Sequence, residues 1–335
     1  MSDPAGTGDA ASAAEADANR EFLISGAPHL SGGATTRGIM FNVVLAMVPM
    51  LAASIWFYQL KAVVLVVVTV LGCLIAEAVA NWMRGRDQSS LSDGSAIVTG
   101  MILAFSLPPG LQPYMAFIGG AVAIVLAKSV FGGLGQNLFN PAMVGRAFLM
   151  ICFPAAMGLW LEPETLYRIG DATIDGVTMA TPLAAAMDPA LTAPGFRELF
   201  IGNVGGCVGE TSAIAALLGG LYLVIRRFAD WRQPLGVFAA VVVFSLIAGD
   251  PIQFHLLSGA LMFGAFFIAT DYVGCPLTGK GRLIFGVGVG VLVMCVRLYG
   301  VYPEGFMFAI LIMNSLTPLI ERWTVPEPFG GNVPA

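Results

Sequence analysis

Apolar runs long enough to cross a lipid bilayer constrain this chain more than any other feature. A helix needs about 20 mostly apolar residues to span the hydrocarbon, and reading between charges and Gly/Pro breaks gives ten candidate runs. They are residues 38–58, 62–83, 94–107, 113–130, 139–159, 211–225, 235–248, 255–270, 283–298 and 305–320. Charged residues make up only 11% of the 335, against roughly 25% in soluble domains. The sequence therefore predicts an all-α polytopic membrane protein.

Several function classes are disfavoured by composition. The five cysteines are scattered without a CxxC pair, which argues against a thiolate zinc site or a four-cysteine iron–sulfur cluster. The two histidines are His29 and His255, and His29 precedes the first run, so a bis-histidine haem is not expected. No basic stripe supports nucleic-acid binding. Residues 1–19 lack a basic start and an apolar core, which predicts a disordered tail rather than a signal peptide.

The positive residues predict an orientation. With a cytoplasmic N-terminus, eleven of them fall on the cytoplasmic side and four on the far side, a strong positive-inside bias. The eleven are Arg20, Arg37, Arg84, Arg86, Lys128, Arg226, Arg227, Arg232, Lys280, Arg282 and Arg322, and the four are Lys61, Arg168, Arg197 and Arg297. The predicted organisation is a disordered cytoplasmic tail (1–21), a first membrane region (22–159), an external loop (160–209), a second membrane region (210–321) and a cytoplasmic tail (322–335).

The two membrane regions resemble each other. Gly100 and Ser106 in the third run have the same spacing as Gly264 and Thr270 in the eighth, and both segments lead into loops with proline. Phe-Gly at 131–132 and Tyr-Gly at 299–300 precede the fifth and tenth runs. Since an odd number of crossings reverses the next copy, five-span repeats must be inverted. We therefore predict two inverted five-helix repeats joined by the external loop.

Three groups of residues are candidates for chemistry. In the external loop, Asp175-Gly-Val-Thr178-Met-Ala180-Thr181-Pro182 reads from physical chemistry alone as a turn. The second group, residues 132–146, places Asn137, Asn140 and Arg146 at membrane depth, where polar groups need partners or a ligand. Helix capping by the two asparagines is an interpretation as well supported as ligand binding.

The third group consists of acids in the apolar runs. Glu77 lies near the inner end of the second run, and Asp271 ends the eighth. Intramembrane acids are ion-pathway candidates by default, although Glu77 could also pair with Arg84.

Taken together, these motifs resemble the D subunits of Rnf ion-translocating electron-transport complexes, which are related to the B subunits of Na⁺-translocating NADH:quinone oxidoreductases. The resemblance runs over residues 22–320 and is strongest at 31–37, 132–146, 175–182, 254–271 and 302–305. In that family an Asp followed by Ser/Thr, a small residue, Ala and Thr is a flavin attachment signal. The resemblance implies FMN joined by a phosphoester to Thr181, with Asp175, Thr178 and Ala180 matching the signal. Met179 replaces the glycine common in the sodium-pump relatives.

The same resemblance implies further cofactors and partners. Asn137 and Asn140 match positions that line a second, non-covalent flavin (riboflavin or FMN). The implied partners are a flavin transferase and the other subunits of the complex, including a second covalent flavoprotein and iron–sulfur subunits. The implied location is the bacterial inner membrane, with both termini cytoplasmic and the flavin loop periplasmic.

Other functions remain open from the residues alone. A secondary transporter or channel would also suit inverted repeats, and a purely structural membrane subunit would carry no chromophore. The motif from Asp175 to Thr181 favours the flavoprotein subunit of a redox-driven ion pump. No nicotinamide or ferredoxin site is evident in the chain, so other subunits must supply those sites.

Overall fold

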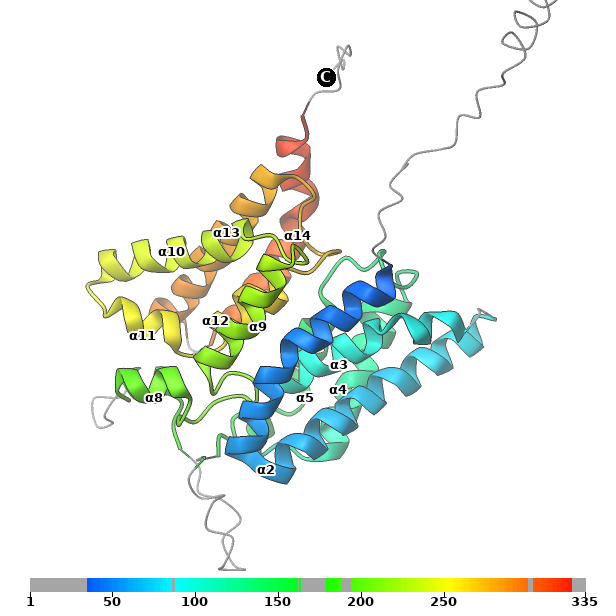
Figure 1. Cartoon of the computed structure of the whole chain (residues 1–335), viewed down its shortest axis with the longest axis horizontal. Coiled ribbons are helices and arrows are strands. Elements are labelled where there is room, and N and C mark those ends of the chain that lie inside the picture. Colours follow the sequence, from blue (N-terminus) through cyan, green and yellow to red (C-terminus); the bar gives the residue numbers. More distant parts are fainter. Residues whose placement is uncertain are drawn as a thin grey trace, which may run out of the picture. The chain divides into compact units, whose positions relative to one another are not determined.

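Two apolar helices joined end to end begin the part of the chain that the structure describes. A computed structural model describes residues 35–85, 88–161, 163, 179–187, 194–300 and 304–326. Helix α2 (Thr36–Met83) is interrupted at Gln59, whose φ of 50° is non-helical (Figure 1). Residues 36–58 and 60–83 are therefore two helices, each longer than the about 20 residues needed to cross a bilayer. This break matches the boundary predicted between the first two runs.

The remaining described segments are also helical, and no β-strand occurs within those ranges. They are η1 (Gln88–Asp93), α3 (Ser95–Phe105), α4 (Pro113–Ile124), the π-helical η2 (Val125–Ser129), α5 (Pro141–Cys152), α6 (Pro154–Met157), α7 (Pro182–Met187), α8 (Phe196–Ile201), α9 (Ala213–Ile225), α10 (Arg232–Ala248), α11 (Ile252–Leu257), α12 (Leu261–Phe263), the π-helical η4 (Gly264–Ile268), α13 (Gly279–Tyr299) and α14 (Phe306–Thr324). The all-helical prediction is confirmed for these residues.

The helices differ in length from the predicted runs. By length and composition, α13 and α2, the latter counted here as one continuous element, are the described helices able to cross a membrane. The helices beginning at Ser95, Pro113, Pro141, Ala213 and Arg232 are shorter and apolar. The run 255–270 is not one helix, because Gly259 adopts a left-handed φ of 67° between α11 and α12. The run 139–159 is divided at Pro154, whose ring removes a backbone donor.

Helix packing follows the same scheme in both halves of the chain. Helix α2 packs against α4 and α4 against α5, as α10 packs against α13 and α13 against α14 (Figure 1). Glycines allow the close approach in each half. A Cβ on Gly72 would lie 2.5 Å from the Phe117 carbonyl oxygen, and one on Gly286 would lie 2.3 Å from the Gln233 carbonyl oxygen. Such small-residue contacts are typical of helices packed in membranes.

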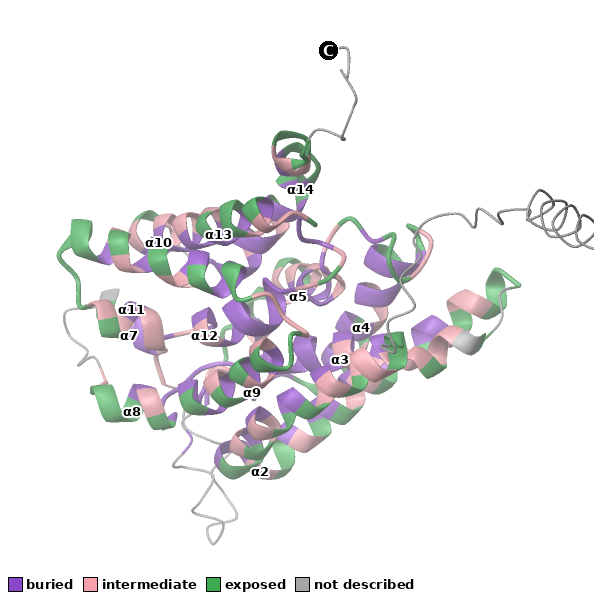
Figure 2. Ribbon diagram, turned by 45° about the horizontal axis from the view of Figure 1, so that its top comes forward, coloured by how far each residue is buried: buried purple, intermediate pink, exposed green. Residues whose placement is uncertain are grey.

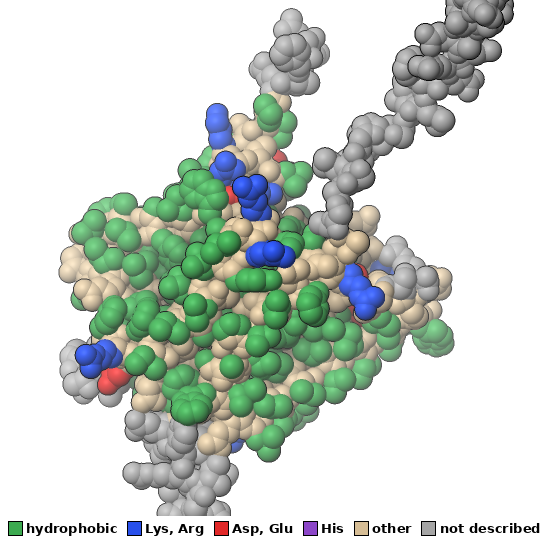
Figure 3. Space-filling model, viewed as in Figure 1, with side chains coloured by type: hydrophobic (Ala, Val, Ile, Leu, Met, Phe, Trp, Pro, Cys, Tyr) green, Lys and Arg blue, Asp and Glu red, His purple; other side chains and the backbone are tan. Residues whose placement is uncertain are grey.

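Buried and exposed residues are distributed as expected for a bundle in lipid. The facing sides of the helices are buried, whereas the outward sides are exposed (Figure 2). Those outward sides are largely hydrophobic, and Lys and Arg side chains gather towards the ends of the helices (Figure 3). At the centre, the Phe105 ring meets Phe263 edge to face, with centroids 6.1 Å apart. This contact joins the third helix of the first half to the broken helix of the second.

Candidate functional site

Thr181 lies at the start of the short helix α7, where a small cavity meets the loop. Its Oγ1 accepts a hydrogen bond from the Ala184 backbone N–H at 3.2 Å, and the residue is half-buried. The cavity has a volume of about 30 Å³. Besides Thr181, its walls include Gly205, Glu210, Gly259 and Glu304. The hydroxyl thus remains partly open to solvent beside two carboxylates from distant parts of the sequence.

The residues before Thr181 are only partly described. Asp175 and Thr178 lie outside the described residues, whereas Ala180 is described and half-buried. Met179 donates its backbone N–H to the Trp160 carbonyl at 3.0 Å. A Cβ on Gly205 would lie 2.5 Å from the Met179 side chain, so this glycine makes the room in which Met179 packs. The methionine that stands where the sodium-pump relatives commonly have glycine therefore has a defined place in the fold.

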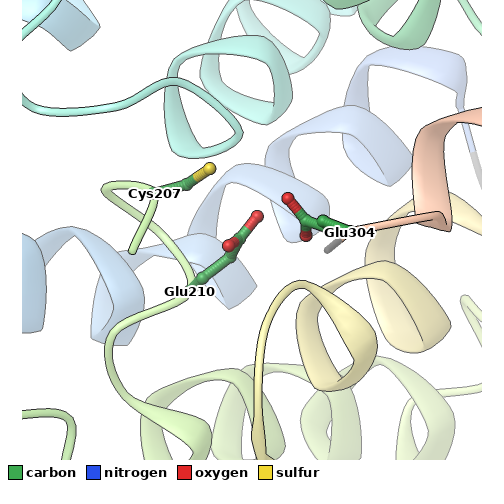
Figure 4. Close-up of side chains that lie close together, drawn as sticks. All are labelled: Cys207, Glu210 and Glu304. Carbon is green, nitrogen blue, oxygen red and sulfur yellow. The ribbon is translucent and has the colours of Figure 1, made fainter. Parts of the chain in front are cut away.

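A buried charge cluster forms one side of this cavity. Arg146, on α5, donates from Nη2 to Glu304 Oε2 at 2.5 Å and from Nη1 to Glu210 Oε1 at 3.5 Å. Its Nη2 also lies 3.5 Å from the Cys207 sulfur. Glu210 and Cys207 come from the loop before α9, and Glu304 comes from the segment before α14 (Figure 4). We call these four side chains the arginine cluster.

The arginine cluster resembles a metal site in its ligand atoms but not in its charge. Atoms of Cys207, Glu210 and Glu304 lie within 4.8 Å of one another. However, the Arg146 guanidinium bonds to all three and supplies the positive charge that a cation would otherwise bring. A buried carboxylate pair needs such a partner, because isolated charges are costly to bury. We therefore assign the cluster as an ion-pair network rather than a metal centre.

The two carboxyls of the cluster have different proton affinities. Burial raises the pKa of Glu210 well above its usual range, and the Glu304 charge raises it further against the opposing effect of Arg146. Burial would also raise the pKa of Glu304, but the Arg146 charge and the hydrogen bonds from Glu210, Arg146 and the Ala260 N–H together outweigh that effect and leave the pKa below its usual value. Glu210 is therefore the carboxyl of this pair that retains a proton more readily, and it faces the cavity that contains Thr181.

Asn137 and Asn140 lie together in a second cavity, of about 80 Å³, which we call the asparagine cavity. Asn140 caps α5, since its Oδ1 accepts from the N–H groups of Ala142 and Met143 at 3.0 and 3.3 Å. Its Nδ2 donates to Asp271 Oδ2 at 3.2 Å. Asn137 Nδ2 donates to the Phe139 carbonyl at 3.1 Å. The cap interpretation therefore holds for the Asn140 oxygen, while its amide nitrogen joins α5 to Asp271.

Glu77 pairs with Lys128 and not with Arg84, the partner considered from the sequence. Lys128 Nζ lies 2.7 Å from Glu77 Oε1, and both side chains are only 4% exposed. Lys128 also donates to Ser95 Oγ at 2.6 Å, and both of these residues line the asparagine cavity. The π-helical η2 carries Lys128. Glu77 is thus connected to the asparagine cavity through Lys128, so the second and third groups of candidate residues from the sequence meet in one region.

The Thr181 cavity and the asparagine cavity lie at opposite ends of α9. Glu210, just before this helix, lines the first, and Leu223 near its end lines the second. A helix of 13 residues is about 20 Å long at 1.5 Å per residue. The non-continuous helical segment from Gly259 to Asp271 connects the same two cavities, because Gly259 lines the first and Asp271 lines the second. Two polar sites are thus separated by about 20 Å of apolar helix.

Four charged residues at these sites were not among the candidates for chemistry named from the sequence. Glu210, Glu304 and Lys128 stand at the ends of apolar runs, where charge is ordinary. Arg297 lies near the end of α13, is buried, and donates to the Ser258 carbonyl at 2.8 Å. The available signal was Arg146, whose place inside a predicted span required a buried acid somewhere in the chain.

Comparisons with known proteins agree on one family. A family model described as the NQR2, RnfD, RnfE family matches residues 23–330. The D subunit of a Na⁺-translocating ferredoxin:NAD⁺ oxidoreductase complex from Acetobacterium woodii is 41% identical over 313 residues, covering 92% of this chain and 95% of its own. The D subunit of a proton-translocating ferredoxin:NAD⁺ oxidoreductase complex from Clostridium ljungdahlii is 37% identical, with coverages of 92% and 96%. The D subunit of an ion-translocating oxidoreductase complex from Halorhodospira halophila is 39% identical, with coverages of 92% and 95%.

Proposed function

The chain belongs to the NQR2, RnfD, RnfE family, and we propose on this premise that it is the membrane flavoprotein subunit of a redox-driven ion pump. The complex would transfer electrons between ferredoxin and NAD and couple this transfer to movement of Na⁺ or H⁺. The names of the relatives support the complex and its reaction class. The chain alone would hold no complete active site, since ferredoxin and nicotinamide would bind elsewhere.

We propose that Thr181 carries FMN through a phosphoester. The supporting observation is the half-buried hydroxyl at the mouth of a cavity, in a loop segment whose sequence matches the attachment signal. The ester forms when Oγ1 attacks the flavin phosphorus and loses its proton. The donor must therefore bring a leaving group on that phosphate, as a flavin dinucleotide does when it releases a nucleoside monophosphate. A flavin transferase would catalyse this step.

The small size of the cavity beside Thr181 favours an arrangement in which the flavin ring system lies outside the cavity. A volume of about 30 Å³ is far below the roughly 300 Å³ of the smallest usual ligand pockets. The phosphoester oxygen can still accept the Ala184 N–H, as the hydroxyl does now. When bound, the flavin would supply electron-accepting and electron-donating chemistry. Glu210 and Glu304 would hold a proton and a negative charge, respectively, on the cavity side of Thr181.

The asparagine cavity fits a second, non-covalent flavin in chemistry but not in size. Amide, hydroxyl and carboxylate groups surround apolar walls, as in many cofactor pockets. Its volume of about 80 Å³, however, is too small for the ring system in this arrangement of side chains. Asn137 and Asn140 are proposed as lining residues of such a site only if α5 or Phe228 shifts. No electron-transfer step is therefore assigned to this cavity.

We also propose that the chain forms ten spans in two inverted repeats, in the bacterial inner membrane. Two observations support this proposal. The helices of the two halves pack in the same scheme, and corresponding helices of the two halves begin at opposite cavities. Ser95 starts α3 at the asparagine cavity, whereas Gly259 precedes α12 at the Thr181 cavity. Asn140 and Glu304 precede the fifth helices of the two halves at the same opposite cavities. Under this proposal the termini are cytoplasmic and the loop 160–209 is periplasmic.

The topology can be tested with reporter fusions. A reporter after Ile320 should be cytoplasmic, and a reporter within residues 160–209 should be periplasmic. Finding both on the same side of the membrane would overturn the ten-span count. Within this topology, Glu77 and Asp271 are the proposed contributors to the ion pathway.

The flavin assignment is tested by replacing the acceptor oxygen. Thr181→Ala should abolish flavin fluorescence of the protein on a denaturing gel, whereas Thr181→Ser should retain it because the hydroxyl remains. Thr178→Ala is the matched control and should keep the flavin, with at most a reduced amount. Fluorescence retained in Thr181→Ala would refute this acceptor, and fluorescence absent from the wild-type chain would refute covalent attachment.

A further inference from the structure

A basic groove lies at the end of the bundle where α9 ends and α10 and α13 begin. It has a volume of about 510 Å³, which is within the roughly 300–1,000 Å³ of ligand sites. We define the basic groove by its lining residues Arg227, Arg232, Arg282, Asp230 and Gln233, together with aromatic side chains. The groove adjoins the asparagine cavity, but these five residues line only the groove and do not line that cavity.

The groove carries an excess of positive charge. Asp230 Oδ2 accepts from Arg282 at 2.8 Å and from Arg232 at 3.4 Å. The Arg227 guanidinium has no hydrogen-bond or ion-pair partner among the described residues, and the residue is exposed. Three arginines against one aspartate leave two uncompensated charges facing one cavity of ligand size.

A buried donor in the groove is also unsatisfied. Gln233 is 1% exposed, and its Nε2 has no hydrogen-bond acceptor among the described residues. Its polar neighbour is the Cys275 thiol, which is at most a weak acceptor. A buried amide donor left without a partner is costly and rare in folded proteins. An anionic oxygen in the groove would supply the missing acceptor and would also meet the free Arg227 guanidinium.

The surroundings of the groove indicate that the anion is attached to an apolar molecule. Exposed apolar side chains flank it on α9 and α10, among them Ile225 at 69% and Leu235 at 48% exposure. Trp231, 55% exposed, immediately precedes α10, and its ring centroid lies 5.6 Å from the Arg232 guanidinium carbon. Tryptophan prefers the boundary between hydrocarbon and water. Lys and Arg gather at the same end of the bundle (Figure 3).

We propose that the basic groove binds the phosphate of an anionic phospholipid, whose acyl chains lie along the exposed apolar sides of α9 and α10. Arg227 and Gln233 bond the phosphate oxygens, and Arg232 and Arg282, fixed by Asp230, provide the surrounding positive charge. Basic pockets at helix ends near the cytoplasmic leaflet are suited to such headgroups. The inference rests on the membrane placement of the chain and is independent of the flavin on Thr181.

The test uses the full chain in neutral detergent and native mass spectrometry of lipids added at rising concentration. Phosphatidylglycerol should bind in preference to phosphatidylcholine. Arg227→Gln should weaken phosphatidylglycerol binding about five-fold, the effect of one basic residue near a membrane surface. Arg226→Gln is the matched control. It removes the same charge from the adjacent residue, which lies over Phe228 and not in the groove, so binding should stay within about two-fold of wild type.

Two further arms keep the result interpretable. Arg227→Gly suits the left-handed φ of 60° at this position and replaces Arg227→Gln if that variant folds poorly. Gln233→Leu should weaken phosphatidylglycerol binding without lowering the melting temperature of lipid-free protein. Equal weakening by Arg226→Gln and Arg227→Gln would show general charge attraction and would overturn the proposal. Inorganic phosphate that displaces the lipid at equal concentration would show a small-anion site and would also overturn it.

Discussion

Breaking the buried pair of Glu77 and Lys128 should destabilise the chain far more than removing an exposed charge. The two side chains are 4% exposed and 2.7 Å apart. Lys128→Met would leave Glu77 buried with Ser90, at 3.2 Å, as its remaining side-chain partner among the described residues. Losing one member of a buried ion pair costs about 3–5 kcal/mol, because the other charge stays desolvated. Glu77→Gln should cost a similar amount by leaving the Lys128 ammonium unpaired.

The double variant separates the contribution of the ion pair to stability from the contribution of side-chain packing. Glu77→Gln with Lys128→Met removes both charges, so it should cost much less than the sum of the single variants, with a coupling on the order of 3 kcal/mol. Unfolding in mixed micelles with rising dodecyl sulfate, followed by circular dichroism, measures these differences. Lys61→Met is the charge-matched control at an exposed position and should change stability by less than about 0.5 kcal/mol. Additive single effects would refute the pairing.

Three further variants test separate parts of the structure. Gly286→Ala should cost about 1–3 kcal/mol, because its Cβ would lie 2.3 Å from a carbonyl oxygen of α10, whereas Gly158→Ala meets nothing closer than 3.7 Å and should be tolerated in the same unfolding assay. Asn140→Ser should keep the α5 cap but lose the amide bond to Asp271, so it should lower ion transport by the complex. Asn140→Leu should lower ion transport too and should also lose about 1 kcal/mol of stability with the cap. Burial opposes ionisation of Asp230, but hydrogen bonds from the Arg232 backbone and Arg282 hold its pKa below the usual value. Its stabilising contribution is therefore present above about pH 4 and lost as pH falls through the lowered pKa, so wild-type stability should fall more steeply than that of Asp230→Asn in acid.

The sequence predicted the parts of this structure that depend on local pattern. Long apolar runs gave most helices, and the interruption near Gln59 was placed correctly because a polar residue and Lys61 divide the runs there. Asn140 before Pro141 gave the start of α5 through its capping side chain. Interruptions inside apolar runs were missed. The left-handed Gly259 is one of many glycines in such runs, and nothing local distinguishes it.

Contacts between distant residues were beyond prediction from pattern. Arg146 finds its two glutamates 64 and 158 residues away along the chain. Lys128 pairs with Glu77 at a separation of 51 residues, although Arg84 lies closer to Glu77 in the sequence. Such pairs depend on how helices of the two halves pack, and a single sequence carries no record of that packing. The sequence showed that Arg146 and Glu77 are charged residues within apolar runs, but it did not show which residues pair with them.

The covalent flavin on Thr181 is tested most directly by mapping the modified peptide. Trypsin should release residues 169–197 from the wild-type chain, since Arg168 and Arg197 bound this segment. The proposal predicts that this peptide carries the mass of FMN less one water, and that fragmentation places the addition on Thr181. An unmodified peptide, or an addition located on Thr173, Thr178 or Thr192, would contradict it.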